Sequence, residues 1–287
     1  EGLTEVEVSR GILKVFEEIT SNAFDNVSRG QTTKIEVEIT PEEFSVKNNG
    51  SPIPIVEHEE HKVTIPELVF GHFLTGDNYN DEEERLGGGR NGYGAKLTNA
   101  FSKSFNVEVV DDNVKKKLRL MYKNNMTEHK LKITSCSSGK SYTKITAAID
   151  FPKFGLQEAT PLILKAWERR VYDLAATTPS KVAVYLNKTR IPIKGYKDYC
   201  QQWGECLYFK ISPTVELAVY KTPYDVAPPS FLNGVQCNRG THIQQWVLPL
   251  TKKLAEVVSK TLKVSISAAK MAKHVMVTGN FVIKNPK

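Results

Sequence analysis

The sequence predicts an α+β fold in two domains that meet near residue 158. Residues 5–29 repeat apolar side chains with the period of a helix, and the segments after them alternate apolar and polar residues with the period of strands. Near residue 158 the pattern changes, and a second helix opens a new series of strands. We therefore expect one domain over residues 1–158 and a second over residues 159–287.

The first domain begins with the helix over residues 5–29. At about 100° per residue, its apolar stripe holds Ile12, Phe16, Ile19 and Ala23, which we expect to face the core. Helices are also predicted at "TIPELVFGHFL" and "YGAKLTNAFSKSF". Strands are predicted at "TKIEVEIT", "FSVKNNG", "NVEVVD", "KKLRLMYK", "HKLKITS" and "SYTKITAAI".

The second domain begins with a helix over residues 160–177, where Thr160 followed by Pro161 is typical of a helix start. A long amphipathic helix, "THIQQWVLPLTKKLAEVVSKTL", is expected to be interrupted at Pro249. The predicted strands are "KVAVYLN", "IPIKGY", "VELAVYK", "PSFLNGVQC" and "HVMVTGNFVI".

Composition excludes some classes of protein and leaves others open. No run approaches the roughly 18 apolar residues of a membrane span, and the first residues lack the features of a signal peptide. The four cysteines have no Cys-x-x-Cys spacing, so we expect no cysteine metal site and infer a reducing compartment. The net charge of +7 fits a nucleic-acid partner and equally fits a protein that binds nucleotides.

The segment "LGGGRNGYGAK", residues 86–96, is rich in glycine. It contains G-x-G-x-x-G, but a dinucleotide-binding turn follows a buried strand, and here "NDEEER" comes before it. A P-loop is also excluded, because Lys96 is followed by Leu97 rather than Ser or Thr. A surface linker and an anion-binding loop remain, and the second is favoured because glycines expose backbone N–H groups and Lys96 supplies positive charge.

The first helix also carries a polar row formed by Glu18, Asn22, Asp25 and Arg29. A solvated face would explain such a row, but Asn22, Asp25 and Asn26 lower helix propensity relative to Glu, Lys or Ala. An amide oxygen such as that of Asn22 is a ligand type that Mg²⁺ accepts. Glu18, one turn away, is then placed to polarise a water molecule.

The segment "SVKNNGSPIPI" allows two interpretations. Asn-Gly is a hairpin signal. Alternatively, the asparagine at the end of the strand reads a purine edge, and the Ile-Pro pairs cover the face of the base.

The order of these segments resembles the GHKL, or Bergerat, ATP-binding fold, which is shared by DNA gyrase, histidine kinases, and chaperone and mismatch-repair ATPases. The segments "VFEEITSNAFDN", "NNGSPIPIVEH", "PELVFGHFLT" and "GGRNGYGAKL" resemble more closely the ATPase region of eukaryotic type IIA DNA topoisomerases. "RRVYDLA", "IPIKGY" and "FLNGV" resemble their transducer domain. The resemblance implies a GHKL α/β sandwich followed by a transducer domain like domain 2 of ribosomal protein S5.

The resemblance also implies roles for individual residues. Glu18 is the general base, Asn22 ligates Mg²⁺, Asn48 meets the adenine edge, and Asn78 lies near the ribose. Thr146 assists at the adenine, whose pocket is lined by Ile53 and Phe70. The implied ATP-binding set is Asn22, Asp25, Asn26, Arg29, Asn48, Ile53, Val69, Phe70, Gly76, Asp77, Asn78, Gly88, Gly89, Arg90, Asn91, Gly92, Tyr93, Gly94, Ala95, Lys96 and Thr146.

The chain departs from the family pattern at several places. Pro52 replaces a second glycine after "NNG", and Gly76-Asp77 replaces a Ser-Ser pair before the ribose asparagine. The family's Gln-Thr-Lys loop is expected just beyond Lys287, and the N-terminal strap that protomers exchange is not recognised. We therefore expect this chain to bind Mg²⁺ and nucleotide but to hydrolyse ATP poorly by itself.

The leading hypothesis is the ATPase N-gate module of a topoisomerase, with ATP and Mg²⁺ as its cofactors. The resemblance implies a homodimer on ATP binding, DNA as a partner of the whole enzyme, and a nuclear site, or a mitochondrial one in some lineages. We see neither the tyrosine nucleophile nor the carboxylate cluster that DNA cleavage needs. The alternatives are another GHKL ATPase, of chaperone or mismatch-repair type, and a non-catalytic DNA-binding or dimerisation module.

Overall fold

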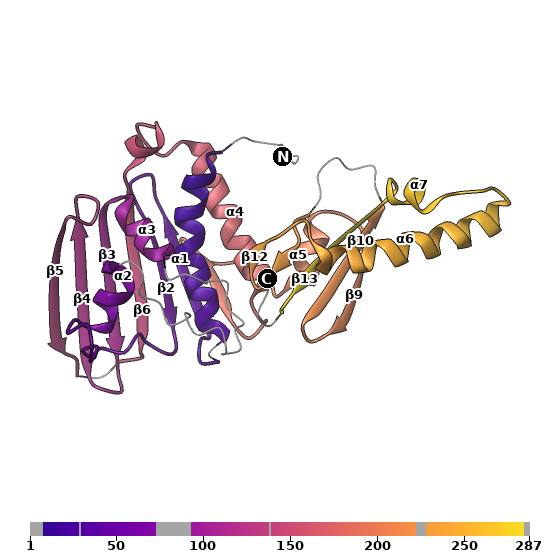
Figure 1. Ribbon diagram of the computed structural model, residues 1–287. Helices are drawn as coiled ribbons and strands as arrows, with labels where there is room; N and C mark the ends of the chain where they lie inside the picture. The colour runs from indigo at the N-terminus through magenta and orange to yellow at the C-terminus, as the bar shows by residue number, and fades with distance from the viewer. Residues whose placement is uncertain (1–7, 29, 73–92, 138, 222–227, 284–287) are drawn as a thin grey trace.

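The computed structural model describes residues 8–28, 30–72, 93–137, 139–221 and 228–283, and within them two β-sheets form the frame (Figure 1). The first sheet has eight described strands in the order β5-β4-β3-β6-β2-β1-β7-β8. Its pairs are antiparallel except β1 with β7, which are parallel. The strands are β1 (Lys34–Ile39), β2 (Phe44–Asn49), β3 (Ser102–Asp111), β4 (Lys116–Lys123), β5 (Glu128–Ser135), β6 (Tyr142–Ile149), β7 (Ala183–Leu186) and β8 (Thr189–Arg190).

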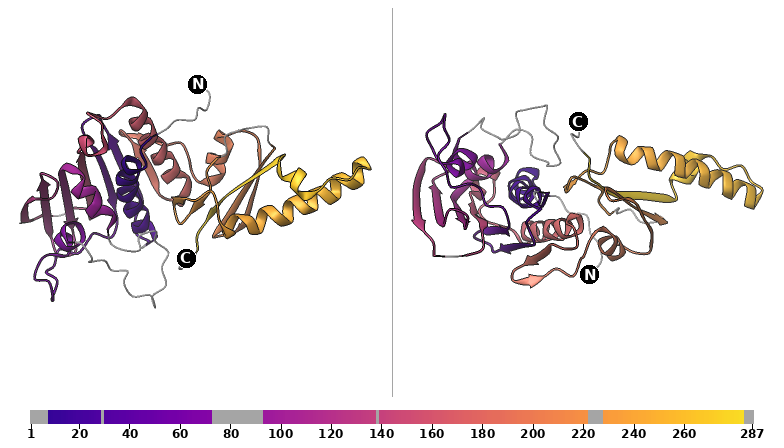
Figure 2. Two further views of the ribbon diagram at one scale, coloured as in Figure 1. Left: turned by 45° about the horizontal axis from the view of Figure 1, so that its top comes forward. Right: turned by 90° about the horizontal axis from the view of Figure 1, so that it is seen from below.

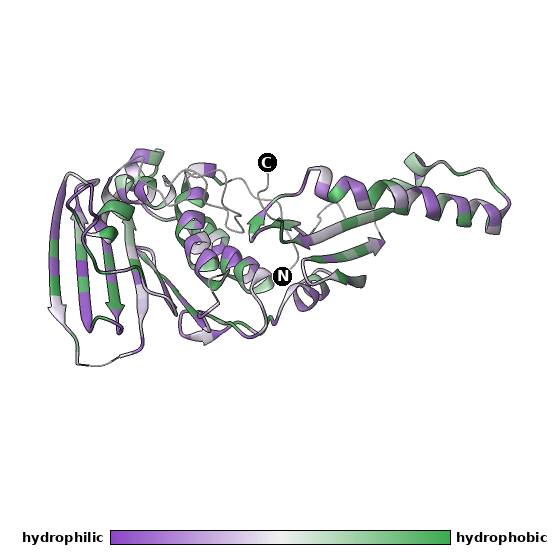
Figure 3. Cartoon of the chain, turned by 60° about the horizontal axis from the view of Figure 1, so that its bottom comes forward, coloured by the Kyte–Doolittle hydropathy of each residue, from purple (hydrophilic) through white to green (hydrophobic). Residues whose placement is uncertain are grey.

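Helices cover one face of this sheet. They are α1 (Arg10–Ser28), α2 (Ile65–Gly71), α3 (Gly94–Ala100) and α4 (Pro161–Thr177), with the 3-10 turn η1 (Phe151–Phe154) before α4. The predicted apolar stripe of α1 is confirmed, since Ile12, Phe16, Ile19 and Ala23 are all buried. The strands show the matching alternation of hydrophilic and hydrophobic bands in Figure 3.

An aromatic cluster joins α1 and α4 to the sheet. The Trp167 ring stacks on Phe16 at 5.3 Å between centroids and meets Phe44 edge-on at 5.2 Å. The indole N–H of Trp167 donates to the carbonyl of Ile12 at 3.1 Å, so its one polar atom is satisfied in the core. This cluster fixes the position of α1 over β2.

The second sheet has the order β12-β11-β13-β10-β9 among the described residues. Its strands are β9 (Cys206–Ser212), β10 (Val215–Lys221), β11 (Phe231–Leu232), β12 (Val235–Gln236) and β13 (Val275–Phe281); the accompanying helices are α5 (Tyr196–Gln202), α6 (Thr241–Leu262) and α7 (Ala268–Ala272). Figure 2 shows α6 extending away from the first sheet. No described helix is long and apolar enough to cross a membrane.

Three predicted elements are corrected. The helix α6 continues through Pro249, which is exposed, so water can satisfy the carbonyl that proline leaves without an N–H partner. "IPIKGY" forms no strand, because Pro192 lacks a ladder donor and Tyr196 already begins α5. The helix predicted from Tyr93 to Phe105 ends at Ala100, and the strand β3 takes over from Ser102.

The predicted domain boundary at residue 158 is too early. The strand β7 pairs in parallel with β1, with Ile35 opposite Val184, and β8 extends the same sheet. The helix α4 packs against α1 and belongs to the crossover that a parallel pair of strands requires. The first unit therefore extends to Arg190.

The two units meet where α1 and α4 contact the β11–β12 hairpin. The Phe24 ring lies directly over Gly234, where an added Cβ would come within 2.8 Å of the ring. The guanidinium of Arg170, on α4, donates to the carbonyl of Gly234 at 2.6 Å. Both contacts fall on one glycine, which ties the helix layer of the first unit to the second sheet.

Candidate functional site

Glu18, the first residue of the predicted polar row of α1, lies against the start of α3. One carboxylate oxygen of Glu18 lies 2.7 Å from the Lys14 ammonium. The other, Oε2, lies over Gly94, since a Cβ at that position would be 1.8 Å from it. The glycine thus permits a contact between the carboxylate and the backbone of α3 that no other residue would allow. Asn22, one turn further along α1, is exposed.

The helix α3 is held in place by its neighbours. The Thr98 hydroxyl donates to the carbonyl of Val15 at 2.8 Å, and the Asn99 amide donates to the carbonyl of Phe70 at 3.0 Å. Lys96, on the same helix, is fully buried. The segment predicted to bind anions therefore enters a helix anchored to both α1 and α2.

The asparagine predicted to meet a purine lies on the helix-covered face of the first sheet. Asn48 is buried and sits directly opposite Thr143 in the ladder between β2 and β6. The Thr143 hydroxyl is buried and has no hydrogen-bond partner among the described residues. A buried hydroxyl without a partner is costly unless something else satisfies it. Asn48 and Thr143 therefore form a pair of adjacent polar side chains among the apolar residues of β2 and β6 on the helix-covered face.

Thr146 does not belong to this group. It is three residues from Thr143, and an odd separation in a strand places the two side chains on opposite faces. Thr146 pairs with Asn106 and Ser45 on the face away from the helices. Thr143 was not among the predicted residues, although the alternation in the sequence could have indicated it. Ile145 and Ala147 lie on the same face of β6 as Thr143, whereas Lys144 lies on the opposite face.

The turn after Asn48 is braced by α1. The Asn26 amide donates to the carbonyl of Ser51 at 2.9 Å and its carbonyl accepts from the Thr32 hydroxyl at 2.7 Å. Gly50 has φ +106°, and a Cβ there would lie 2.8 Å from the backbone N of Thr32. Asn26 therefore holds the turn that presents Asn48.

The apolar side chains of the predicted base pocket belong to the core of the first unit. Phe70 is buried with its ring centroid 5.9 Å from that of Phe105, while Ile53 and Val69 are half-buried against the same core. Asp25 is half-buried on α1. Two further predicted residues lie at the start of α3: Tyr93 is its N-cap residue and Ala95 is buried. The remaining predicted residues lie outside the described part of the chain: Arg29, Gly76, Asp77, Asn78, Gly88, Gly89, Arg90, Asn91 and Gly92.

Comparison with known proteins places this arrangement in a family. Residues 7–152 match the family described as histidine kinase-, DNA gyrase B-, and HSP90-like ATPase. The crystal structure of the ATPase region of Saccharomyces cerevisiae topoisomerase II is similar, with a TM-score of 0.90 at 35% identity, covering 99% of this chain and 76% of that one. The chain belongs to the DNA topoisomerase II ATPase family.

Other members of this topoisomerase family match nearly the whole chain. The ATPase and transducer domains of Balamuthia mandrillaris DNA topoisomerase II match with a TM-score of 0.88 at 33% identity, covering 96% of this chain and 74% of that one. DNA topoisomerase 2 of Saccharomyces cerevisiae is 36% identical over 308 residues, 98% of this chain. The chain spans 22% of that relative's length.

Proposed function

We propose that this chain binds and hydrolyses ATP as the N-gate module of a DNA topoisomerase II. The observation that carries the proposal is the carboxylate of Glu18 seated over Gly94, at the point where the glycine-rich segment enters α3. In an ATPase family this contact places a base beside the segment expected to bind phosphates. A second unit of transducer type, built around the second sheet, accompanies it.

Glu18 acts as the general base. A catalytic base must lie within hydrogen-bond reach of the water that it activates, and its geometry must be fixed. The ion pair with Lys14 holds Oε1, and the contact with Gly94 positions Oε2. Oε2 is the oxygen directed at the segment where the terminal phosphate would lie, so it is the one that accepts the proton.

Phosphate binding is assigned to the start of α3 and the segment before it. Tyr93, Gly94, Ala95 and Lys96 supply the described part, and Gly88, Gly89, Arg90, Asn91 and Gly92 supply the rest. The exposed amide of Asn22 fits a Mg²⁺ ligand, since Mg²⁺ takes oxygen donors and keeps waters and phosphates as further ligands. When bound, Mg²⁺ neutralises charge on the phosphates.

The adenine is assigned to Asn48 and Thr143. An adenine presents both a donor and an acceptor. The amide of Asn48 and the Thr143 hydroxyl, which has no partner in the described part of the chain, match that pattern. The apolar cover of the base is assigned to Ile53, Val69 and Phe70. Asp25 and Asn26 on α1 are assigned as supports, together with Arg29. The ribose side is assigned to Gly76, Asp77 and Asn78.

The whole protein's activity is proposed from that of its relatives. ATP binding closes two such modules into a homodimer, and this closure drives one DNA duplex through a transient break in another. The break is made by parts that this chain does not contain. The proposed location is the nucleus.

The substitution Glu18→Gln tests the assignment. Glutamine keeps the shape of the side chain but cannot accept the proton, so turnover in the intact enzyme should fall by roughly 10²-fold or more. Titration calorimetry with Mg²⁺ and a non-hydrolysable ATP analogue should show unchanged binding to the chain. Glu17→Gln, one residue away on another side of α1, is the matched control.

Two results would contradict the proposal. Unchanged turnover in Glu18→Gln would remove Glu18 from the base role. Absence of nucleotide binding by the parent chain would favour a non-catalytic module instead.

A further inference from the structure

The face of the first sheet opposite the helices carries a concentration of positive charge. On this face, β3 to β6 carry six Lys and Arg against two carboxylates, Glu108 and Glu128. We call this side of β3 to β6 the outer face. It is defined by Asn106, Glu108, Lys117, Arg119, Met121, Lys123, Glu128, Lys130, Lys132, Lys144 and Thr146.

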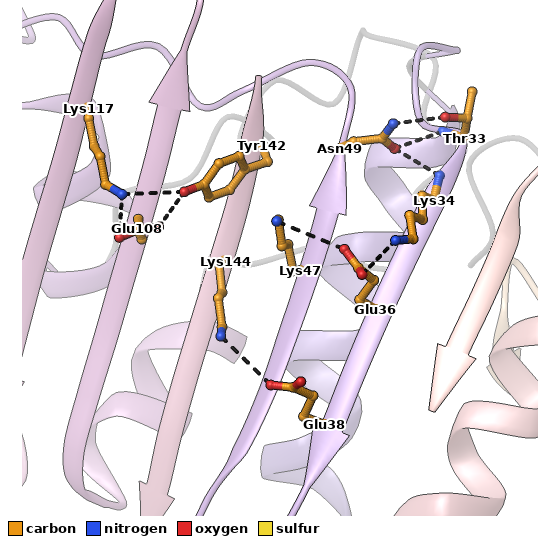
Figure 4. Close-up of polar contacts among 10 residues, drawn as sticks. All are labelled: Thr33, Lys34, Glu36, Glu38, Lys47, Asn49, Glu108, Lys117, Tyr142 and Lys144. Atoms are coloured by element: carbon orange, nitrogen blue, oxygen red, sulfur yellow. Dashed lines mark hydrogen bonds and ion pairs between the residues drawn. The ribbon is translucent and has the colours of Figure 1, made fainter. Parts of the chain in front are cut away.

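Part of this charge is neutralised within the sheet. Figure 4 shows Lys117 beside Glu108, and Lys144 reaching Glu38. Lys117 and Arg119 lie 2.9 and 2.8 Å from the Glu108 carboxylate. Burial opposes ionisation of Glu108, but hydrogen bonds from Tyr142, Lys117 and Arg119 outweigh it and lower the pKa of Glu108 to about 2. Glu108 is thus a fixed negative centre that orders the cations around it.

Two lysines at the edge have no such partner. Lys130 and Lys132, both on β5, form no ion pair among the described residues. They point to the same face two residues apart, a separation of about 6.8 Å along an antiparallel strand. Along one strand of duplex DNA a phosphate recurs about every 3.4 Å of axis. Because the backbone winds around this axis, neighbouring phosphates lie further apart than that rise, and the two flexible lysine side chains can each reach a separate phosphate of one strand.

The surface beside them is hollowed. A shallow cavity of about 360 Å³ is lined by Asn106, Val107, Glu108, Arg119, Met121, Lys144 and Thr146. Asn106 and Thr146 are opposite each other in the ladder between β3 and β6 and are shorter than the surrounding side chains. Arg119, opposite Lys132, and Lys144 stand on its rim. This hollow, with longer cationic side chains beside it, can accommodate a phosphate backbone that lies across the strands.

Protection of the sheet edge does not explain the pattern by itself. Lysines on an edge strand do discourage pairing with other chains. However, the outer face continues the positive charge into β4 and β6, which are interior strands. On the other face of β5, Leu131 and Ile133 carry no charge.

We propose that the outer face binds the backbone of duplex DNA without reading its sequence. This inference rests on the proposed function only in its choice of polyanion, because the relatives are DNA topoisomerases. The binding is electrostatic, so it depends on salt through counterion release. Lys130 and Lys132 can bind a phosphate at the lowest free-energy cost, because neither has to give up an ion pair with a described residue.

The test compares two double variants of the chain. Fluorescence anisotropy with a labelled duplex of about 25 base pairs gives the DNA affinity across a salt titration. Lys130→Gln with Lys132→Gln should reduce the slope of log K against log salt by up to about 1.8, and lower affinity roughly 10- to 60-fold at about 0.1 M salt. Lys62→Gln with Lys153→Gln removes the same charge from other exposed sites and should leave the slope unchanged.

The outcomes separate this inference from the proposed function. An unchanged slope in the β5 variant, or an equal loss in the control, would overturn the DNA assignment. Calorimetry with the ATP analogue should give the same affinity in the parent and in both variants. This measurement tests the proposed ATP-binding function independently of DNA binding. If the double variant fails to fold, the single substitutions Lys130→Gln and Lys132→Gln each carry half of the expected slope change.

Discussion

Replacing Gly94 by alanine displaces the carboxylate of the proposed base, Glu18, without changing Glu18 itself. Gly94 begins α3 without a positive φ, so alanine meets no backbone strain there. Its Cβ, however, would lie 1.8 Å from Oε2 of Glu18, 2.6 Å from Cδ and 3.1 Å from Cγ. Since carbon and oxygen atoms in contact lie about 3.3 Å or more apart, the carboxylate must shift by more than about 1 Å.

The size of the effect follows from that displacement. A misplacement of about 1 Å in a catalytic group can cost roughly 10²-fold in rate, or about 2.7 kcal/mol. The folded state should change little, because the Glu18 side chain is 21% exposed and can turn toward solvent. We expect Gly94→Ala to lose roughly 10²-fold in ATP turnover with the melting temperature nearly unchanged.

The assay is steady-state phosphate release by the intact enzyme, with calorimetry and thermal melting on the chain. Gly139→Ala is the matched control, because a Cβ at that exposed glycine would meet nothing within 4 Å. Turnover within about threefold of the parent would refute the reasoning, since it would mean that the position of Oε2 over Gly94 does not matter.

Two further predictions follow from the first sheet. Thr143→Val should weaken binding of the Mg²⁺-loaded ATP analogue by roughly 2- to 12-fold, the value of one hydrogen bond. Thr146→Val, on the other face of β6, should leave the affinity unchanged. Equal losses in the two variants would contradict the assignment of the adenine to the helix-covered face. Glu108→Gln should lower stability by about 1 kcal/mol at about pH 7. Because the folded-state pKa of Glu108 is lowered from 4.5 to about 2, that difference should be complete above pH 4.5 and shrink as the pH falls toward 2. Melting curves that differ equally at about pH 7 and about pH 3 would contradict the ion-pair account.

Local periodicity was enough to predict the helix that carries Glu18 and most strands of the first sheet. Local periodicity did not predict features that depend on residues far apart in the sequence. The parallel pairing of β7 with β1 joins segments separated by α4 and most of the first sheet, and nothing in "KVAVYLN" alone indicates its partner. The boundary at residue 158 was wrong for this reason.

The site was predicted unevenly for similar physical reasons. Asn48 and Glu18 stand in recognisable segments, and their neighbours in sequence are the reason that they are proposed as site residues. The contact between Glu18 and Gly94 joins two helices, so spacing along the chain could not reveal it. Thr143 and Thr146 differ only in which face of β6 they occupy, a choice that the alternation around Lys144 settles once it is applied.

The late arrival of β7 has a consequence for biosynthesis. Until residues 183–186 leave the ribosome, β1 has no neighbour on one side. At about 5–20 residues per second, the wait for the intervening stretch of about 150 residues lasts roughly 7–30 s. During that time an open strand edge is exposed to other nascent chains. Lys34, Glu36 and Glu38 project from β1 and discourage such pairing, so the charges seen in the finished sheet also protect the unfinished one.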